Sequence, residues 1–214
     1  MGADQRKREE FNTMARVYGP KCRICRREGV RLNLKGSKCE SDKCVLSKRQ
    51  YAPGQHGNSR SKQSGYAKQL REKQKAKRIY GLLEKQFRKY VEQAFNSKGI
   101  TSEALMQRLE SRLDNLVYKS GFAVSRPQAR QYIRSGFFSV NDKVVKTPSQ
   151  QLKTGDTLKP INFEKLHLRE GFSLPEWITA NVKEKYVKLE RLPSLDEFSE
   201  SFDLPLIIEF YSMK

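Results

Sequence analysis

The stretch Ser125-Arg-Pro-Gln-Ala-Arg-Gln-Tyr-Ile-Arg-Ser-Gly136 carries the signals of a complete short helix. Ser125 and Gln128 have the spacing of a capping box, and Pro127 falls in the first turn, where a missing N–H leaves no bond unmade. Gly136 suits the left-handed exit from a helix. The stretch therefore predicts a capped helix that ends at a sharp turn.

Three arginines recur every four residues along this helix: Arg126, Arg130 and Arg134. Side chains at that spacing share one face, so we expect an outward row of guanidinium groups. No acidic residue stands four positions away from any of them to pair with it. Guanidinium binds phosphate with two parallel hydrogen bonds, which favours structured nucleic acid. The alternative is an ordinary solvated basic face.

Periodicity predicts helices in the sequence before this stretch and strands directly after it. Residues 66–79, 82–96 and 101–117 have helical composition or a stripe of apolar residues at helical spacing. Residues 138–145 alternate around an Asn-Asp turn, which predicts a hairpin. Residues 204–210 are interpreted as a buried strand or extended segment. The expected fold class is α+β.

Four cysteines fall within the 23 residues from Cys22 to Cys44, and the other 191 residues contain none. Cys22 and Cys25 form one close pair, and Cys39 and Cys44 form another. Two such pairs around a short loop are typical of a tetrahedral Zn²⁺ site, which four thiolates close to water. We therefore expect one structural zinc ion at these four residues.

Other states of the cysteines stay open at this point: two disulfides, a redox pair at Cys22 and Cys25, or inert thiols. The charged N-terminus lacks the apolar core of a signal peptide, so we expect a reducing compartment, where structural disulfides are rare. No stretch approaches the roughly 20 apolar residues of a membrane span. The chain is expected to be soluble and cytoplasmic.

The net charge of +19 is unevenly distributed. Residues 1–100 contain 26 Lys and Arg against 9 Asp and Glu, whereas residues 151–214 contain 9 against 11. We therefore expect a polyanion-binding surface in the first half. In the acidic last quarter, Glu190, Glu197 and Glu200 face few cations nearby in sequence, which suits contact with a basic protein; a solvated acidic surface is the alternative.

Several motifs together resemble the ribosomal protein S-four family of the bacterial small subunit. They are the cysteine array, the loop Tyr51-Ala-Pro-Gly-Gln-His-Gly57, the segment Glu110-Ser-Arg-Leu-Asp-Asn115, the Ser125–Arg130 stretch and the terminal Ile208-Glu-Phe-Tyr211. The likeness runs from Met14 to the C-terminus. Residues 1–13 are extra relative to the family, and because many members lack the thiols, keeping all four argues for dependence on zinc.

The resemblance implies a structural constituent of the small ribosomal subunit rather than an enzyme. It implies primary binding of small-subunit ribosomal RNA at a multi-helix junction, nucleation of subunit assembly, contact with ribosomal protein S-five, a place beside the mRNA entry path and a role in translational accuracy. The polar residues 1–13 predict a disordered extension, and the cysteine spacing predicts a zinc-binding element at 14–48. The resemblance further implies a basic loop and helical domain at 49–103 completed by 191–214, and an inserted S-four-type RNA-binding module at 104–190.

Basic and stacking side chains in these parts are the expected RNA contacts, and Glu190, Glu197 and Glu200 the expected protein contacts. The RNA contacts are Arg23, Arg26, Arg27, Lys35, Lys48, Arg49, Tyr51, Gln55, His56, Arg60, Lys62, Tyr66, Lys68, Arg71, Lys75, Arg78, Arg112, Arg126, Arg130 and Arg134.

Two other function classes are weaker. An RNA-modifying enzyme needs a catalytic constellation, but His56 and His167 are distant in sequence and neither has an obvious nucleophile partner. A zinc-finger transcription factor would be expected to offer a recognition helix after the metal pairs, whereas a loop rich in glycine follows Cys44.

Overall fold

The computed structural model describes residues 19–59, 62–169, 171–181 and 185–213. The extension predicted at 1–13 and the predicted contact Arg60 lie outside these residues. In chain order the elements are α2 (Lys21–Glu28), α3 (Ser37–Glu40), α4 (Val45–Lys48), α5 (Gly65–Ile79), α6 (Glu84–Phe95), α7 (Thr101–Glu110), α8 (Leu113–Lys119), α9 (Arg126–Arg134), β1 (Phe138–Val140), β2 (Lys143–Val144), β3 (Thr157–Pro160), the 3₁₀ turn η1 (Phe163–Lys165), β4 (Ile178–Asn181), β5 (Tyr186–Leu189), the 3₁₀ turn η2 (Leu195–Glu197) and α10 (Leu204–Ser212).

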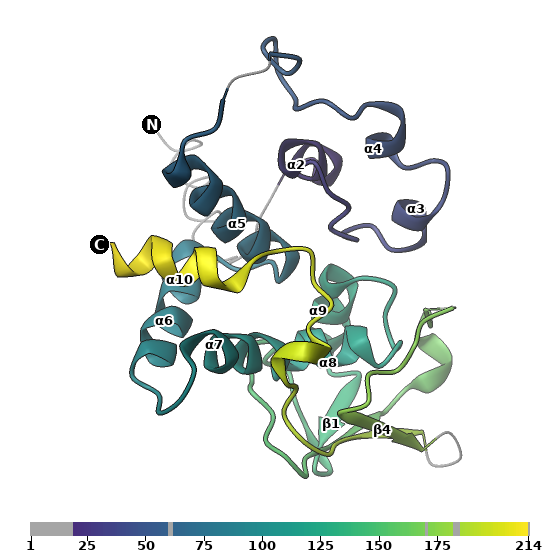
Figure 1. Cartoon of the computed structure of the whole chain (residues 1–214). Coiled ribbons are helices and arrows are strands. Elements are labelled where there is room, and N and C mark those ends of the chain that lie inside the picture. The colour runs from purple at the N-terminus through teal and green to yellow at the C-terminus, as the bar shows by residue number, and fades with distance from the viewer. Residues whose placement is uncertain (1–18, 60–61, 170, 182–184, 214) are drawn as a thin grey trace, which may run out of the picture.

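One hydrophobic cluster unites α5, α6, α7 and α10, which we call the helical lobe. Its fully buried side chains include Phe87, Leu105 and Ile207, and Leu32 and Leu34 join it from the segment after α2. In Figure 1 the last helix, α10, lies beside α5 and α6, so the end of the chain returns to its first half. The cysteine element, residues 21–48, lies above this lobe in the same view.

A second cluster unites α8, α9 and the strands, which we call the sheet lobe. The described strands form one antiparallel sheet in the order β2-β1-β3-β5-β4. Leu116, Ile133, Phe138 and Trp177 are among the side chains buried in this lobe. Helices with one small antiparallel sheet confirm the α+β prediction.

The stretch around α9 folds as its signals predict. The Ser125 hydroxyl accepts a hydrogen bond from the N–H of Gln128, and Gly136 leaves the helix at φ 75°. The Gln128 side chain accepts from the N–H of Val124 rather than Ser125, which shifts the second half of the capping box by one residue. The hairpin turns at two residues of positive φ, Asn141 (48°) and Asp142 (64°).

Two element predictions are wrong. The helix predicted over 101–117 breaks after Glu110, because the carbonyls of Pro148 and Gln150 accept the N–H groups of Asp114 and Leu113 and so start a new helix, α8. The segment at 204–210 is helical rather than extended. Asp203 accepts from the N–H of Leu206 as the N-cap of this helix, and Pro205 lies in its first turn.

The hydrophobic clusters divide the chain near residue 111. Leu105, Met106 and Leu109 belong to the helical lobe, and Leu113 opens the sheet lobe. The predicted domain limits, with a boundary at residue 104, stay predictions. Within the part of the chain that the structure describes, no helix is both long and apolar enough to cross a membrane.

Candidate nucleic-acid interface

Some basic side chains of α5 contact the cysteine element, whereas others are exposed. The side chain of Glu28 in α2 is fully buried, and its Oε1 accepts from Arg71 at 3.3 Å and from Arg78. Burial raises the pKa of Glu28 despite both guanidinium groups. Lys75 pairs with Glu72 at 2.7 Å. Lys73, Ala76 and Ile79 of α5 are also buried, so this helix packs against the rest of the chain as well as presenting basic side chains.

Arg26 ties α2 to the glycine-rich loop. Its Nε donates to the carbonyl of Tyr51 at 3.0 Å, its Nη2 to that of Ala52 at 3.3 Å, and its guanidinium lies 4.7 Å from the centre of the Tyr51 ring. Gln55 and His56 of this loop are exposed. The loop thus presents polar side chains from a backbone that an arginine anchors.

The four cysteines are free thiols in one neighbourhood. Cys25, Cys39 and Cys44 are buried and Cys22 is half-buried. Burial raises the pKa of Cys25, and the negative charges of the other three sulfurs raise it further. The pKa of Cys39 is also raised by burial, although the backbone N–H of Lys35 donates to its sulfur at 3.4 Å and favours the thiolate.

A zinc site would use these thiols, whose mutual proximity and N–H donor suit a cluster of thiolates. Among the described residues, however, no three or more His, Cys, Asp or Glu side chains are arranged to hold a metal ion. The expectation of zinc therefore rests on the donor set and its spacing.

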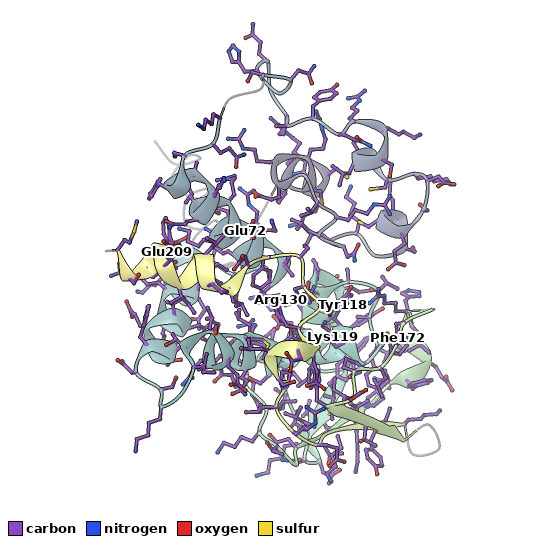
Figure 2. All side chains as sticks on the ribbon, viewed as in Figure 1. Glu72, Tyr118, Lys119, Arg130, Phe172 and Glu209 are labelled. Atoms are coloured by element: carbon purple, nitrogen blue, oxygen red, sulfur yellow. The ribbon has the colours of Figure 1, made fainter. Side chains whose placement is uncertain are left out.

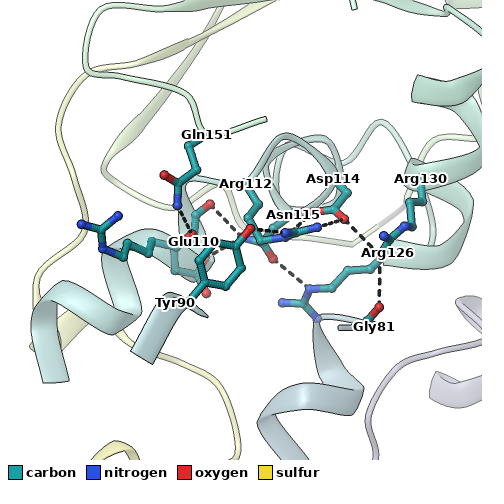
Figure 3. Close-up of polar contacts among 10 residues, drawn as sticks. Gly81, Tyr90, Glu110, Arg112, Asp114, Asn115, Arg126, Arg130 and Gln151 are labelled. Atoms are coloured by element: carbon teal, nitrogen blue, oxygen red, sulfur yellow. Dashed lines mark hydrogen bonds and ion pairs between the residues drawn. The ribbon is translucent and has the colours of Figure 1, made fainter. Parts of the chain in front are cut away.

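Arg112 is not available to RNA, which corrects that prediction. Its side chain is fully buried; it donates to both carboxylate oxygens of Asp114 at 3.0 and 2.7 Å and to the hydroxyl of Tyr90 at 2.6 Å. Figure 3 shows Arg112 with dashed lines to both Tyr90 and Asp114. Arg112 therefore joins α8 to α6 of the helical lobe.

The prediction that the three arginines of α9 form an outward row is also wrong. Arg126 is buried and bonded to Asn115 and Glu200. Arg130 is half-buried, donates to the carbonyl of Gly81 at 3.1 Å and lies 3.6 Å from Asp114 (Figure 3). Arg134 is exposed. The acidic partners come from elsewhere in the chain, so the absence of a carboxylate at i±4 did not predict their pairing.

The predicted protein contacts have intramolecular cations as partners, contrary to expectation. Glu190 pairs with Lys188 at 3.3 Å, and Glu197 with Arg191 at 2.5 Å. Hydrogen bonds from Arg191 and the backbone of Ser194 lower the pKa of Glu197 to about 2. Glu200 binds Arg126 and Lys119 and is largely buried.

The remaining predicted contacts form what we call the exposed contact set. All are exposed, and all but one lie between residues 23 and 68: Arg23, Arg27, Lys35, Lys48, Arg49, Tyr51, Gln55, His56, Lys62, Tyr66, Lys68 and Arg134. Figure 2 shows many long side chains of the cysteine element and α5 projecting from the upper part of the molecule.

A buried polar cluster at the meeting of the lobes was missed from the sequence. The hydroxyl of Tyr80 donates to Glu110 at 2.5 Å, and the amide of Asn115 donates to the same carboxylate at 2.8 Å. Polar residues within the apolar stripes of 101–117 were the available signal for such a cluster.

Comparisons with known proteins cover most of the chain. A family model described as "Ribosomal protein S4/S9 N-terminal domain" matches residues 16–110, and one described as "S4 domain" matches residues 111–158. The protein named "Small ribosomal subunit protein uS4" of Natranaerobius thermophilus is 48% identical over 208 residues, covering 93% of this chain and 100% of that protein. A relative of the same name from Thermodesulfovibrio yellowstonii is 46% identical with the same coverage, and "Small ribosomal subunit protein uS4A" of Clostridium botulinum is 48% identical.

Proposed function

This chain belongs to the uS4 family of bacterial small-subunit ribosomal proteins, and from that premise we propose that it is a primary binder of small-subunit ribosomal RNA at a multi-helix junction. The family is one of cytoplasmic, ribosome-bound structural proteins that bind ribosomal RNA, and not of enzymes. In this proposal the protein nucleates subunit assembly, contacts ribosomal protein S-five, borders the mRNA entry path and contributes to translational accuracy.

The observation that carries the RNA proposal is the exposed contact set. All of its cations except Arg134 lie in residues 1–100, where Lys and Arg outnumber Asp and Glu by 26 to 9. Lys and Arg that neutralise phosphates release counterions, which makes binding strongly dependent on salt. Folded RNA is selected mainly by the shape of its backbone, which suits a surface spread over several elements.

Competitive filter binding tests the proposal with a folded small-subunit junction fragment and an unrelated RNA duplex of equal length. We expect tighter binding to the junction at every salt concentration, and a loss of about 10³-fold or more between 50 and 200 mM salt for both RNAs. Equal affinities for the two RNAs at equal salt would reject a specific junction binder.

We also propose that one structural Zn²⁺ is bound by Cys22, Cys25, Cys39 and Cys44. Two observations support this assignment: the four sulfurs interact electrostatically, and the backbone N–H of Lys35 donates a hydrogen bond to the sulfur of Cys39. When bound, the ion would tie α2 to the segment around α3, which buries few apolar residues of its own. Four thiolates complete its coordination, so its role would be structural.

Cys39→Ser tests the zinc proposal, with Ser37→Ala on the same short helix as the control. We expect the wild type and the control to carry one zinc per chain by elemental mass spectrometry, and the Cys39 variant to lose the metal and the amide protection of residues 21–48. Wild-type protein without metal, or a Cys39 variant with unchanged protection, would exclude a structural zinc ion.

For contact with S-five we propose the exposed carboxylates Glu176 and Glu190, whose side chains are 88% and 43% exposed. Glu200 is paired with Arg126 inside the protein and is not part of this proposal. Glu176→Lys with Glu190→Lys should weaken association with purified S-five while leaving RNA affinity no lower than wild type, since neither residue is basic. Unchanged association would remove the idea.

A further inference from the structure

Arg126 is inserted between an aromatic ring of each lobe. Its guanidinium carbon lies 4.9 Å from the ring centre of Tyr80, which belongs to the helical lobe, and 4.6 Å from that of Tyr118, which belongs to the sheet lobe. Only 7% of the residue is exposed. A guanidinium in this position attracts the faces of both rings and holds the two lobes together.

Hydrogen bonds lead from the same guanidinium into both lobes. Nε donates to Oδ1 of Asn115 at 2.8 Å, and the Asn115 amide donates to Oε2 of Glu110 at 2.8 Å (Figure 3). The other carboxylate oxygen of Glu110 accepts from the Tyr80 hydroxyl. A chain of polar contacts therefore runs from α9 through α8 and α7 to the end of α5.

The remaining side of Arg126 holds the C-terminal segment. Its Nη2 donates to Oε1 of Glu200, to which Lys119 also lies close, at 3.4 Å. Burial alone would lower the pKa of Arg126, but Glu200 raises it above its ordinary value, and Arg126 in turn lowers the pKa of Glu200. The pair is therefore charged and buried, and removing Glu200 would leave the buried guanidinium without its carboxylate partner.

We propose that Arg126 is a positioning residue for RNA binding, which fixes the two lobes in one relative orientation and does not itself contact RNA. The inference rests on the proposed function. The exposed contact set includes many residues of the first half and Arg134 of the sheet lobe. When the lobes are fixed, both regions meet one RNA together, and their contributions combine through a high effective concentration.

Other contacts also join the parts, so loosening this one need not unfold either lobe. Arg112 bonds Tyr90, and Arg130 bonds the carbonyl of Gly81. Arg169 pairs with Glu40 at 2.9 Å and lies 5.0 Å from the Tyr118 ring centre, so it joins the cysteine element to the sheet lobe.

The test uses the full chain with three variants: Arg126→Lys, Glu200→Gln and the phosphate-contact control Arg134→Ala. Affinity for the junction RNA is measured across a salt series. Arg126→Lys keeps the charge but loses the planar fork, so we expect affinity to fall about tenfold with an unchanged slope of log affinity against log salt. Arg134→Ala should lower the slope by about 1.

Glu200→Gln separates positioning from electrostatics by the sign of its effect. Removing a negative charge should strengthen binding to a polyanion if charge alone matters. A positioning role predicts the opposite, a severalfold weaker affinity, because Arg126 loses its buried partner. Tighter binding by Glu200→Gln, an unchanged affinity in Arg126→Lys, or a reduced slope in Arg126→Lys would each overturn the proposal.

Amide hydrogen exchange without RNA tests the same contact independently. In Arg126→Lys and Glu200→Gln we expect faster exchange in residues 111–120 and 198–203, while the protected amides of α6 in the helical lobe and of the strands in the sheet lobe are unchanged. Unchanged exchange in both segments would overturn the proposal. If wild-type protein shows no preference for the junction, the proposed function fails, whereas the exchange result still decides whether Arg126 joins the lobes.

Discussion

Glu84, at the start of α6, illustrates how one carboxylate holds three elements. It accepts from Lys73 of α5 at 2.7 Å, from Lys77 at 2.8 Å and from the hydroxyl of Tyr211 of α10 at 2.9 Å. Burial alone would raise its pKa, but these hydrogen bonds lower it to about 2. Burial raises the pKa of Tyr211, and its hydrogen bond to the negatively charged Glu84 raises it further.

Glu84→Gln should therefore destabilise the protein in a way that depends on pH. The depressed pKa means that the carboxylate stabilises the fold above its ordinary value of 4.5, and that this contribution is lost as pH falls towards about 2. Because the side chain is 46% exposed, water screens the pairs and we expect a loss of about 1 kcal/mol at neutral pH.

Urea unfolding of the wild type and Glu84→Gln at a series of pH values measures this. Glu92→Gln on the same helix is the control, since Glu92 pairs with Arg88 at 2.9 Å on an exposed surface and should change stability by less than about 0.5 kcal/mol. A difference between wild type and Glu84→Gln that stayed constant as pH fell would contradict the assignment.

Gly36 marks where the cysteine element approaches the sheet lobe. It takes φ 63° and ψ −138°, a region open essentially to glycine alone, and an added Cβ would lie 2.6 Å from Cγ2 of Val124. Gly36→Ala should destabilise by about 2–4 kcal/mol in thermal unfolding.

Gly29→Ala provides the comparison for Gly36. Gly29 has φ 71°, but nothing lies within 4 Å of its added Cβ, so we expect a loss of about 1 kcal/mol only. Equal losses for the two variants would show that the approach to Val124 carries no cost.

At the scale of elements, α10 is a segment whose secondary structure the sequence predicted wrongly. The run Leu204-Pro-Leu-Ile-Ile-Glu-Phe210 contains β-branched residues and was interpreted as extended. Packing on α5 decides the outcome instead: Leu204, Ile207 and Phe210 are buried at helical spacing. Tertiary burial of one face outweighs a local preference of a fraction of a kcal/mol.

Paired alanine substitutions test this element. Ile207→Ala, at a fully buried site, should cost about 2–5 kcal/mol, whereas Ile208→Ala, at a half-buried site, should cost about 1 kcal/mol or less. Chemical unfolding checks both. If Ile208→Ala cost as much as Ile207→Ala, the helical assignment of α10 would be wrong.

Elements with complete local signals were predicted well. Ser125, Pro127 and Gly136 specify α9 within one segment, and Asn141-Asp142 specify the hairpin turn, so no distant contact was needed. The break between α7 and α8 depends on carbonyls of Pro148 and Gln150, more than 30 residues away in the chain. Periodicity alone does not reveal such a contact.

At the scale of the whole molecule, the sequence located the basic half but not the partners of its charges. Lys35, Arg49 and Lys62 are exposed, which their predicted contact with RNA requires. Arg112 and Arg126 were predicted as RNA contacts too but are buried, because Arg112 pairs with Asp114, two residues along the chain, and the fold brings Glu200 to Arg126. Which arginines face solvent and which hold the lobes is therefore a tertiary property.

We propose that the exposed cations of the first half bind structured ribosomal RNA, whereas the acidic last quarter does not. Amide hydrogen exchange of the full chain, with and without a folded small-subunit junction RNA, tests it most directly. We predict added protection in residues 21–80 and in the segment around Arg134, with none in residues 186–213. Protection confined to residues 186–213, or no protection at any residue under binding conditions, would contradict the claim.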